Sequence, residues 1–210
     1  MPQIGTDTKC FDFAQIYLWH ITESAEELAQ QISGGELLLE EAFRTFSSPK
    51  RRLEWLATRA LLQQTQCKGV EILYHSNGAP HLADCNKHIS ISHTQNYVAI
   101  AIAGVPVGID IEHATRNATR AINGFLQPEE IEKLELHSTP TQEALRLWTA
   151  KEAAFKLAPN LATVLKDIIA KPTGSGNKEQ HTYLIEYKCG RSATCHTITT
   201  HGLVLSCCTF

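Results

Sequence analysis

The strongest constraint on the fold is a run of apolar residues that alternates with a period of two. In Tyr97–Ala103, branched Val98, Ile100 and Ile102 alternate with three alanines, the pattern of a strand with two different faces. Turn residues 104–106 follow, and 107–111 continues as a second apolar strand. We therefore expect a sheet, whose small alanine face could admit a packed helix.

The other elements follow from periodicity and from capping residues. Pro49 after Ser47 and Ser48 predicts a helix that begins there and ends near Gln66. The hairpin-like segments 88–103 and 195–208 indicate two similar α/β halves, 1–105 and 106–210. The remaining expectations are strands at 10–20, 70–74, 181–188, 195–200 and 203–208, helices within 21–46 and at 128–137 and 141–157, and a solvated loop at 171–180.

Composition excludes several classes of protein. With 210 residues, 43% of them hydrophobic, and a net charge of −3, the chain is globular and does not favour nucleic acid. Its longest apolar stretch, 97–109, is shorter than the roughly 20 residues of a spanning helix, and the N-terminus does not resemble a signal peptide. Seven cysteines without a CxxC motif indicate reduced thiols in the cytosol.

Two carboxylates end the second apolar strand. In residues 108–112, alternation places Ile109 and Ile111 on one face, and Asp110 and Glu112 on the other. Paired carboxylates repel each other, and Mg²⁺ with its preference for oxygen ligands would relieve this. The alternative is an exposed strand end.

A charged stripe lies on the predicted helix 141–157. Trp148, Glu152 and Lys156 follow at intervals of four residues and share one face, with Lys151 to one side. Glu152 could serve as a metal ligand or base, and the lysines could meet phosphate oxygens. The alternative is an ordinary Glu–Lys helix pair.

Two further motifs suit an anion. Ser92-His93 ends a predicted strand, where its hydroxyl and imidazole could bind phosphate, although such a pair in a turn is commonly structural. Basic residues 50–52 lie near a helix N-terminus, with Arg59 further along the helix. The alternative for this second motif is a solvated basic turn.

Taken together, these motifs resemble the 4′-phosphopantetheinyl transferases of the surfactin-synthetase-activating type. The resembling segments are residues 50–59, 78–80, 91–94, 108–112 and 148–156. The resemblance implies an α+β fold, a pseudodimer of two similar α/β halves with the active site at the seam. It also implies Mg²⁺-dependent transfer of the phosphopantetheine arm of coenzyme A to a serine of an apo acyl or peptidyl carrier protein, which releases adenosine 3′,5′-bisphosphate.

The resemblance also implies roles for individual residues. Mg²⁺ would be held by Asp110, Glu112 and Glu152, and Glu152 would also accept the serine proton. Lys156 would stabilise the departing phosphate, and Lys151 would bind the pyrophosphate. The residues expected to contact coenzyme A are Arg51, Arg52, Arg59, Ser92, His93, Asp110, Lys151 and Lys156, and which arginine holds the 3′-phosphate stays open.

One position departs from the family pattern. Many members carry lysine between the glycine and proline of residues 78–80, where this chain has Ala79. The absence of this lysine would weaken coenzyme A binding by about 1–3 kcal/mol unless Lys87 or Lys68 compensates. Two alternatives therefore stay open: a non-catalytic relative that binds coenzyme A or a carrier protein, and another Mg²⁺-dependent phosphoester enzyme. We expect a cytoplasmic monomer.

Overall fold

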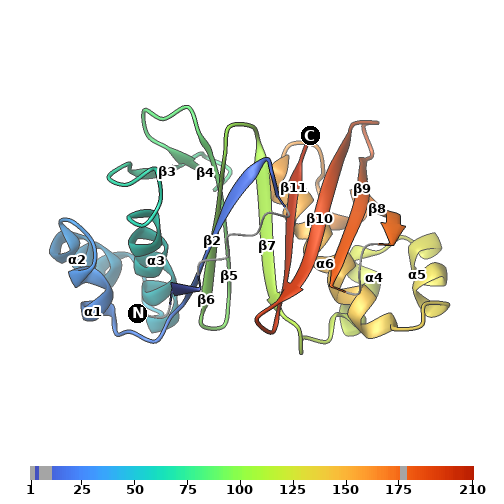
Figure 1. Cartoon of the computed structure of the whole chain (residues 1–210), viewed down its shortest axis with the longest axis horizontal. Helices are drawn as coiled ribbons and strands as arrows, with labels where there is room; N and C mark the ends of the chain where they lie inside the picture. Colours follow the sequence, from blue (N-terminus) through green and yellow to red (C-terminus); the bar gives the residue numbers. More distant parts are fainter. Residues whose placement is uncertain (1–2, 5–10, 176–178) are drawn as a thin grey trace.

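The fold contains two antiparallel sheets and a short hairpin, with helices at both ends (Figure 1). The computed structural model describes residues 3–4, 11–175 and 179–210. The first sheet has the order β1 (Gln3–Ile4), β2 (Ala14–His20), β6 (Tyr97–Ala103), β5 (His88–Thr94). The second has the order β7 (Val107–His113), β11 (Leu203–Thr209), β10 (Ser192–Thr200), β9 (Gln180–Tyr187), β8 (Ile168–Ser175), and the hairpin pairs β3 (Ile72–Tyr74) with β4 (Pro80–Leu82).

The helices fall into two groups along the chain. The first group is α1 (Ala25–Gln30), α2 (Gly35–Thr45) and α3 (Pro49–Leu62). The second is η1 (Ala118–Ala121), α4 (Ile122–Phe125), α5 (Pro128–Glu135), α6 (Pro140–Leu157) and η2 (Leu165–Asp167). Within the described residues, no helix is long and apolar enough to cross a bilayer.

Helix α3 begins where its sequence predicts. Ser48 is the N-cap, its hydroxyl accepts a hydrogen bond from the backbone N–H of Arg51, and Pro49 occupies the first turn. The helix ends at Leu62, four residues before the predicted end at Gln66. Four short hydrogen-bonded turns over residues 61–70 replace the last predicted turn.

The two faces of β6 pack against different partners, and the prediction for its alanine face was wrong. Val98, Ile100 and Ile102 lie in a cluster with the apolar side of α3. Ala99, Ala101 and Ala103 lie instead in a cluster with residues of β7, β10 and β11. Because alanine side chains are short, the second sheet can approach this face of β6 closely. The opposite face carries the larger valine and isoleucine side chains, which pack against α3.

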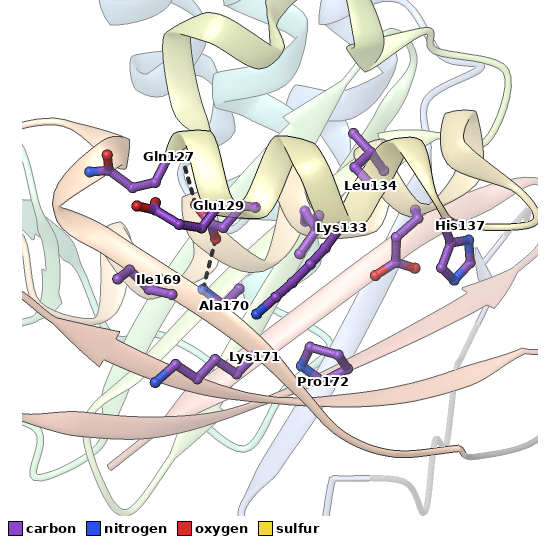
Figure 2. A pocket seen from close by; sticks show the side chains of 12 residues that line it. Gln127, Glu129, Lys133, Leu134, His137, Ile169, Ala170, Lys171 and Pro172 are labelled. Atoms are coloured by element: carbon purple, nitrogen blue, oxygen red, sulfur yellow. Dashed lines mark hydrogen bonds between the residues drawn. The ribbon is translucent and has the colours of Figure 1, made fainter.

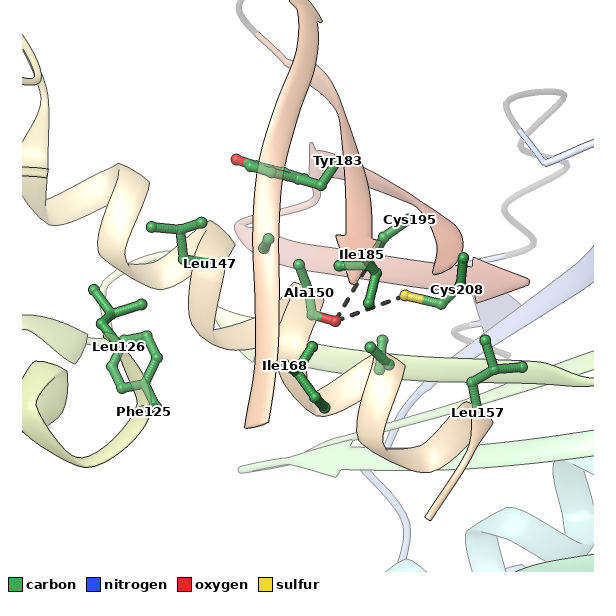
Figure 3. Packing of buried hydrophobic residues seen from close by; sticks show 14 of the residues in the cluster. Phe125, Leu126, Leu147, Ala150, Leu157, Ile168, Tyr183, Ile185, Cys195 and Cys208 are labelled. Atoms are coloured by element: carbon green, nitrogen blue, oxygen red, sulfur yellow. Dashed lines mark hydrogen bonds between the residues drawn. The ribbon is translucent and has the colours of Figure 1, made fainter. Parts of the chain in front are cut away.

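A third cluster lies between the second sheet and α6 (Figure 3). Two of its members are buried cysteines: Cys195 and Cys208 are cross-strand partners on β10 and β11. Their sulfurs lie 4.0 and 3.6 Å from the carbonyl oxygen of Ala150 on α6. Burial raises the pKa of the Cys207 and Cys208 thiols well above the ordinary value, which disfavours the reactive thiolate.

Two other expectations need correction. The predicted loop 171–180 belongs largely to strands, because β8 continues to Ser175 and β9 starts at Gln180, while 176–178 lie outside the described residues. The prediction failed because Lys171 and Pro172 are unusual strand residues. They are accommodated here because β8 is an edge strand, where a lysine can extend into solvent and a proline without a backbone N–H breaks no ladder hydrogen bond. The strand predicted from residue 10 starts at Ala14, and residue 10 itself lies outside the described residues.

Gly108 allows β7 to lie directly against α6. A Cβ at this position would collide with the carbonyl oxygen of Ala153 and lie 2.6 Å from the backbone nitrogen of Leu157. We expect Gly108→Ala to lower the free energy of unfolding by about 1–3 kcal/mol, because strand and helix must separate. Urea unfolding checks this. Gly104→Ala is the control, since its Cβ would meet open space, and equal losses in both variants would contradict the expectation.

Candidate active site

The two sheets meet where edge strand β5 lies beside edge strand β7. Side-chain hydroxyls join them: Ser90 Oγ accepts a hydrogen bond from the Ile109 N–H at 3.0 Å, and Ser92 Oγ accepts one from the Ile111 N–H at 3.2 Å. Strand alternation therefore turns Ile109 and Ile111 into the cluster shared by both sheets, as predicted. Asp110 and Glu112 lie on the other face.

Asp110 is the residue around which the predicted groups gather. Its Oδ1 accepts hydrogen bonds from Ser92 Oγ at 2.8 Å and from Lys156 Nζ at 2.7 Å. The residue is 6% exposed. Its Oδ2 is buried and has no hydrogen-bond partner among the residues that the structure describes, so this carboxylate has one acceptor that those residues leave unused.

Glu112 is held by two residues to which the sequence analysis gave no role. Its Oε2 accepts a hydrogen bond from Thr94 Oγ1 at 3.0 Å, and its Oε1 forms an ion pair with Arg116. The Arg116 guanidinium also lies over the Trp148 ring, 4.6 Å from its centroid. The spacing of four residues between Glu112 and Arg116 is the only signal in the sequence that could have indicated this pair.

Glu152 faces Asp110 from α6. Burial raises the pKa of the Glu152 carboxyl, and the neighbouring Asp110 carboxylate raises it further, while Lys156 and Arg116 oppose this. Glu152 and Lys156, one turn apart on α6, therefore both lie beside Asp110 of β7.

Carboxylate oxygens are the type of ligand that a hard divalent cation such as Mg²⁺ prefers. Asp110 has a buried oxygen without a partner, and it raises the pKa of Glu152, so a cation here would relieve both. Among the residues that the structure describes, however, no three His, Cys, Asp or Glu side chains are grouped closely enough to hold a metal ion. Glu112 is engaged by Arg116, so the three-carboxylate Mg²⁺ site stays a prediction.

A group of cations lies next to this centre. His93 Nε2 lies 2.7 Å from Arg51 NH1, and its Nδ1 lies 3.3 Å from Glu54 Oε1. Glu54 is buried on α3 and also pairs with Arg51 at 3.0 Å and with Lys50 at 3.6 Å. Burial lowers the pKa of His93, with Arg51, Lys156 and Lys50 adding to this and Glu54 opposing it. The sequence does not show that Glu54 is buried and pairs with three basic residues, so its positioning role was not predicted.

Arg52 and Arg59 are not brought to this group. Arg52 donates hydrogen bonds to the carbonyl oxygens of Phe46 and Ser47, and its guanidinium lies over Phe43. Arg59 donates to the Trp55 carbonyl and lies 3.3 Å from the centre of the Trp55 ring. Of the three arginines, Arg51 alone contacts His93 among the described contacts.

Lys151 is also placed away from the carboxylates. It is completely buried, and its Nζ donates to Glu130 Oε2 at 2.6 Å and to the Phe125 carbonyl at 2.8 Å. Burial lowers the pKa of Lys151, and Glu130 opposes this. A phosphate cannot reach this amine without rearrangement, so the structure does not bring Lys151 to the predicted contact with the pyrophosphate.

Glu130 also lines a cavity of about 590 Å³ between α5 and β8 (Figure 2). Its carboxylate accepts hydrogen bonds from the backbone N–H groups of Gln127 and Ala170. Among the described lining residues there is none of the predicted site residues. This cavity and the centre around Asp110 therefore share none of the predicted site residues.

A second cavity does reach the centre. It has a volume of about 550 Å³ and is lined by the β3–β4 turn, the segment before β5 and the end of α6, with Ala79, Lys87 and Lys156 among its walls. Lys156 thus touches both the Asp110 carboxylate and an open cavity. A ligand in this cavity would meet the same ammonium group that pairs with Asp110.

Comparisons with known proteins agree with the motifs. Residues 106–208 match the model of a family described as the 4′-phosphopantetheinyl transferase superfamily. The chain is 32% identical over 107 residues to a 4′-phosphopantetheinyl transferase of Aneurinibacillus migulanus, a match that covers 49% of this chain and 45% of that relative. The chain therefore matches about half the length of this relative. The resemblance drawn from the sequence motifs is confirmed.

Proposed function

We propose that the protein transfers the 4′-phosphopantetheine arm of coenzyme A to a serine of an apo acyl or peptidyl carrier protein, because residues 106–208 match the 4′-phosphopantetheinyl transferase superfamily. The other product is adenosine 3′,5′-bisphosphate. One observation carries the proposal: Lys156, Asp110 and Ser92 are in hydrogen-bond contact although they come from three separate elements. These are residues of three of the motifs from which the resemblance was drawn.

The chain's own residues supply binding and charge. The cations around His93 suit the 3′-phosphate of coenzyme A, with Arg51 at its Nε2 and Lys50 nearby. The buried Glu54 carboxylate holds these basic side chains together, because it lies within ion-pair distance of all three. Lys156 would face the pyrophosphate and neutralise charge on the α-phosphate as it departs.

The proton of the attacking serine needs an acceptor. A raised pKa suits Glu152 to this work, because a base acts best when its pKa approaches the working pH. The serine oxygen then forms a bond to the β-phosphorus, and the bond from that phosphorus to the bridging oxygen of the pyrophosphate breaks. Ser92 fixes the orientation of Asp110 beside Glu152 throughout.

Asp110 and Glu152 would hold Mg²⁺, with Glu112 as a third ligand once it is released from Arg116. When bound, this ion would polarise the phosphate that is attacked. The buried Oδ2 of Asp110 supports this assignment, because no described residue forms a hydrogen bond with it.

The architecture of the whole chain is part of the proposal. We infer two similar halves, 1–105 and 106–210, with the active site at the seam between them. The contact of β5 with β7 supports this, as does the cluster shared by both sheets. One chain would then contain a complete site and act as a monomer in the cytoplasm.

Mass measurement of carrier proteins tests the function. Candidate apo carriers are incubated with the purified protein, coenzyme A and Mg²⁺, and a gain of one phosphopantetheine on the serine is expected. Mg²⁺-dependent binding of coenzyme A with no modification of a broad carrier panel would point instead to the non-catalytic relative. Release of phosphate from nucleotides, unaffected by carriers, would point to another phosphoester enzyme.

Binding of coenzyme A is expected to take up a proton at His93. Burial lowers the pKa of His93 in the free protein, and a phosphate dianion beside it would raise that pKa. A proton is therefore taken up at pH values between the pKa of the free protein and the higher pKa of the complex, and affinity strengthens as the pH falls through this range. Calorimetry in two buffers of different ionisation enthalpy measures the uptake. His93→Gln should reduce it, whereas His137→Gln, on an exposed residue, should not. Equal uptake in all three proteins would contradict the assignment.

A further inference from the structure

The cavity beside Ala79 has an unusual charge composition. Its described lining contains two lysines and three histidines but no aspartate or glutamate; these basic residues are His75, His81, Lys87, His88 and Lys156. Cations gathered without carboxylates favour an anionic ligand, because the field in a concave site adds up from all its walls.

Lys87 is the cation in this cavity that lacks a counter-ion. It is partly buried just before β5, and no carboxylate of the described chain lies within ion-pair distance of its ammonium group. Lys156, by contrast, is already paired with Asp110. An ammonium group on the cavity wall that is not engaged by a carboxylate can form a charge-assisted hydrogen bond with a bound anion.

The position of Lys87 relative to Ala79 gives this cation a role. Both residues line the same cavity, although they come from different segments, the β3–β4 turn and the segment before β5. The Ala79 side chain offers no charge, and its backbone N–H is already bound to Asn77 Oδ1 at 3.0 Å. Lys68 is exposed after α3 and is not among the lining residues, so it does not meet the same requirement.

We propose that Lys87 binds a phosphate of coenzyme A and supplies the positive charge that Ala79 does not. The inference rests on the proposed function, because it takes coenzyme A as the ligand. It assigns affinity for the substrate to Lys87 and leaves the chemical step to the centre around Asp110. The variants should therefore change KM for coenzyme A, with little effect on kcat.

Calorimetric titration with coenzyme A tests the inference directly. Lys87→Gln is expected to weaken Kd by about 10- to 100-fold, the range of one charged hydrogen bond, with an unchanged melting temperature. Lys87→Arg should retain most of the affinity, and Ala79→Lys introduced into Lys87→Gln should restore part of it. Lys68→Gln is the matched control for a general loss of positive charge and should bind like the wild type.

The possible failures are distinguishable. An unchanged Kd in Lys87→Gln, or an equal weakening in Lys68→Gln, would overturn the role of Lys87 while the wild type still binds coenzyme A and modifies a carrier. A wild-type protein that neither binds coenzyme A nor modifies any carrier would overturn the proposed function itself.

Discussion

Asp110→Asn is expected to lower the rate of phosphopantetheine transfer by about 10³-fold, the scale on which a single preorganised electrostatic group contributes to catalysis. Asparagine keeps the shape of the side chain but removes its charge. Lys156 then loses its counter-ion, and the buried Oδ2 that would bind Mg²⁺ becomes part of a neutral amide. The initial rate of carrier modification, followed by mass, checks this.

The control for this variant is Asp84→Asn. Asp84 is exposed and adopts a positive φ of 47°, a conformation that asparagine also tolerates. Its rate should equal that of the wild type. If Asp110→Asn transferred at nearly the wild-type rate, the centre around Asp110 would not be the catalytic site.

Lys151→Met is expected to lower the free energy of unfolding by about 3–5 kcal/mol, since it leaves the buried Glu130 carboxylate without its cation. Glu130 would keep its hydrogen bonds to the backbone of Gln127 and Ala170, which stabilise its charge only in part. Urea unfolding, monitored by circular dichroism, measures the loss.

Two further variants make the interpretation specific. Adding Glu130→Gln to Lys151→Met removes the unpaired charge and should recover part of the stability. Lys133→Met, on the exposed face of α5, should change the free energy of unfolding by less than about 0.5 kcal/mol. A Lys151→Met protein as stable as Lys133→Met would show that the buried pair contributes little.

Local patterns predicted much of the secondary structure and part of the candidate site. The alternation in β6 and β7 and the cap of α3 are set by neighbouring residues, so the sequence alone indicates them. The stripe on α6 is also local, and in the structure its Lys156 donates a hydrogen bond to Asp110. These predictions held because each depends on the period of one element.

The predictions that failed depend on contacts between elements. Nothing in the neighbourhood of Lys151 shows that Glu130, 21 residues earlier, pairs with its amine. The partner of the alanine face of β6 is equally invisible, because a helix and a second sheet both suit small side chains. The role of Arg116 was missed for the same reason, since its contact with Trp148 joins the turn after β7 to α6.

The join between β5 and β7 differs from an ordinary sheet in what mutation can do to it. Backbone ladders persist whatever the side chains are, but here the amides of Ile109 and Ile111 depend on two serine hydroxyls. A single base change in the codon for Ser90 or Ser92 can therefore loosen the alignment of the two sheets. Substitutions at these two serines can therefore weaken the contact between β5 and β7 in steps of one hydrogen bond, while the backbone ladders within each sheet remain.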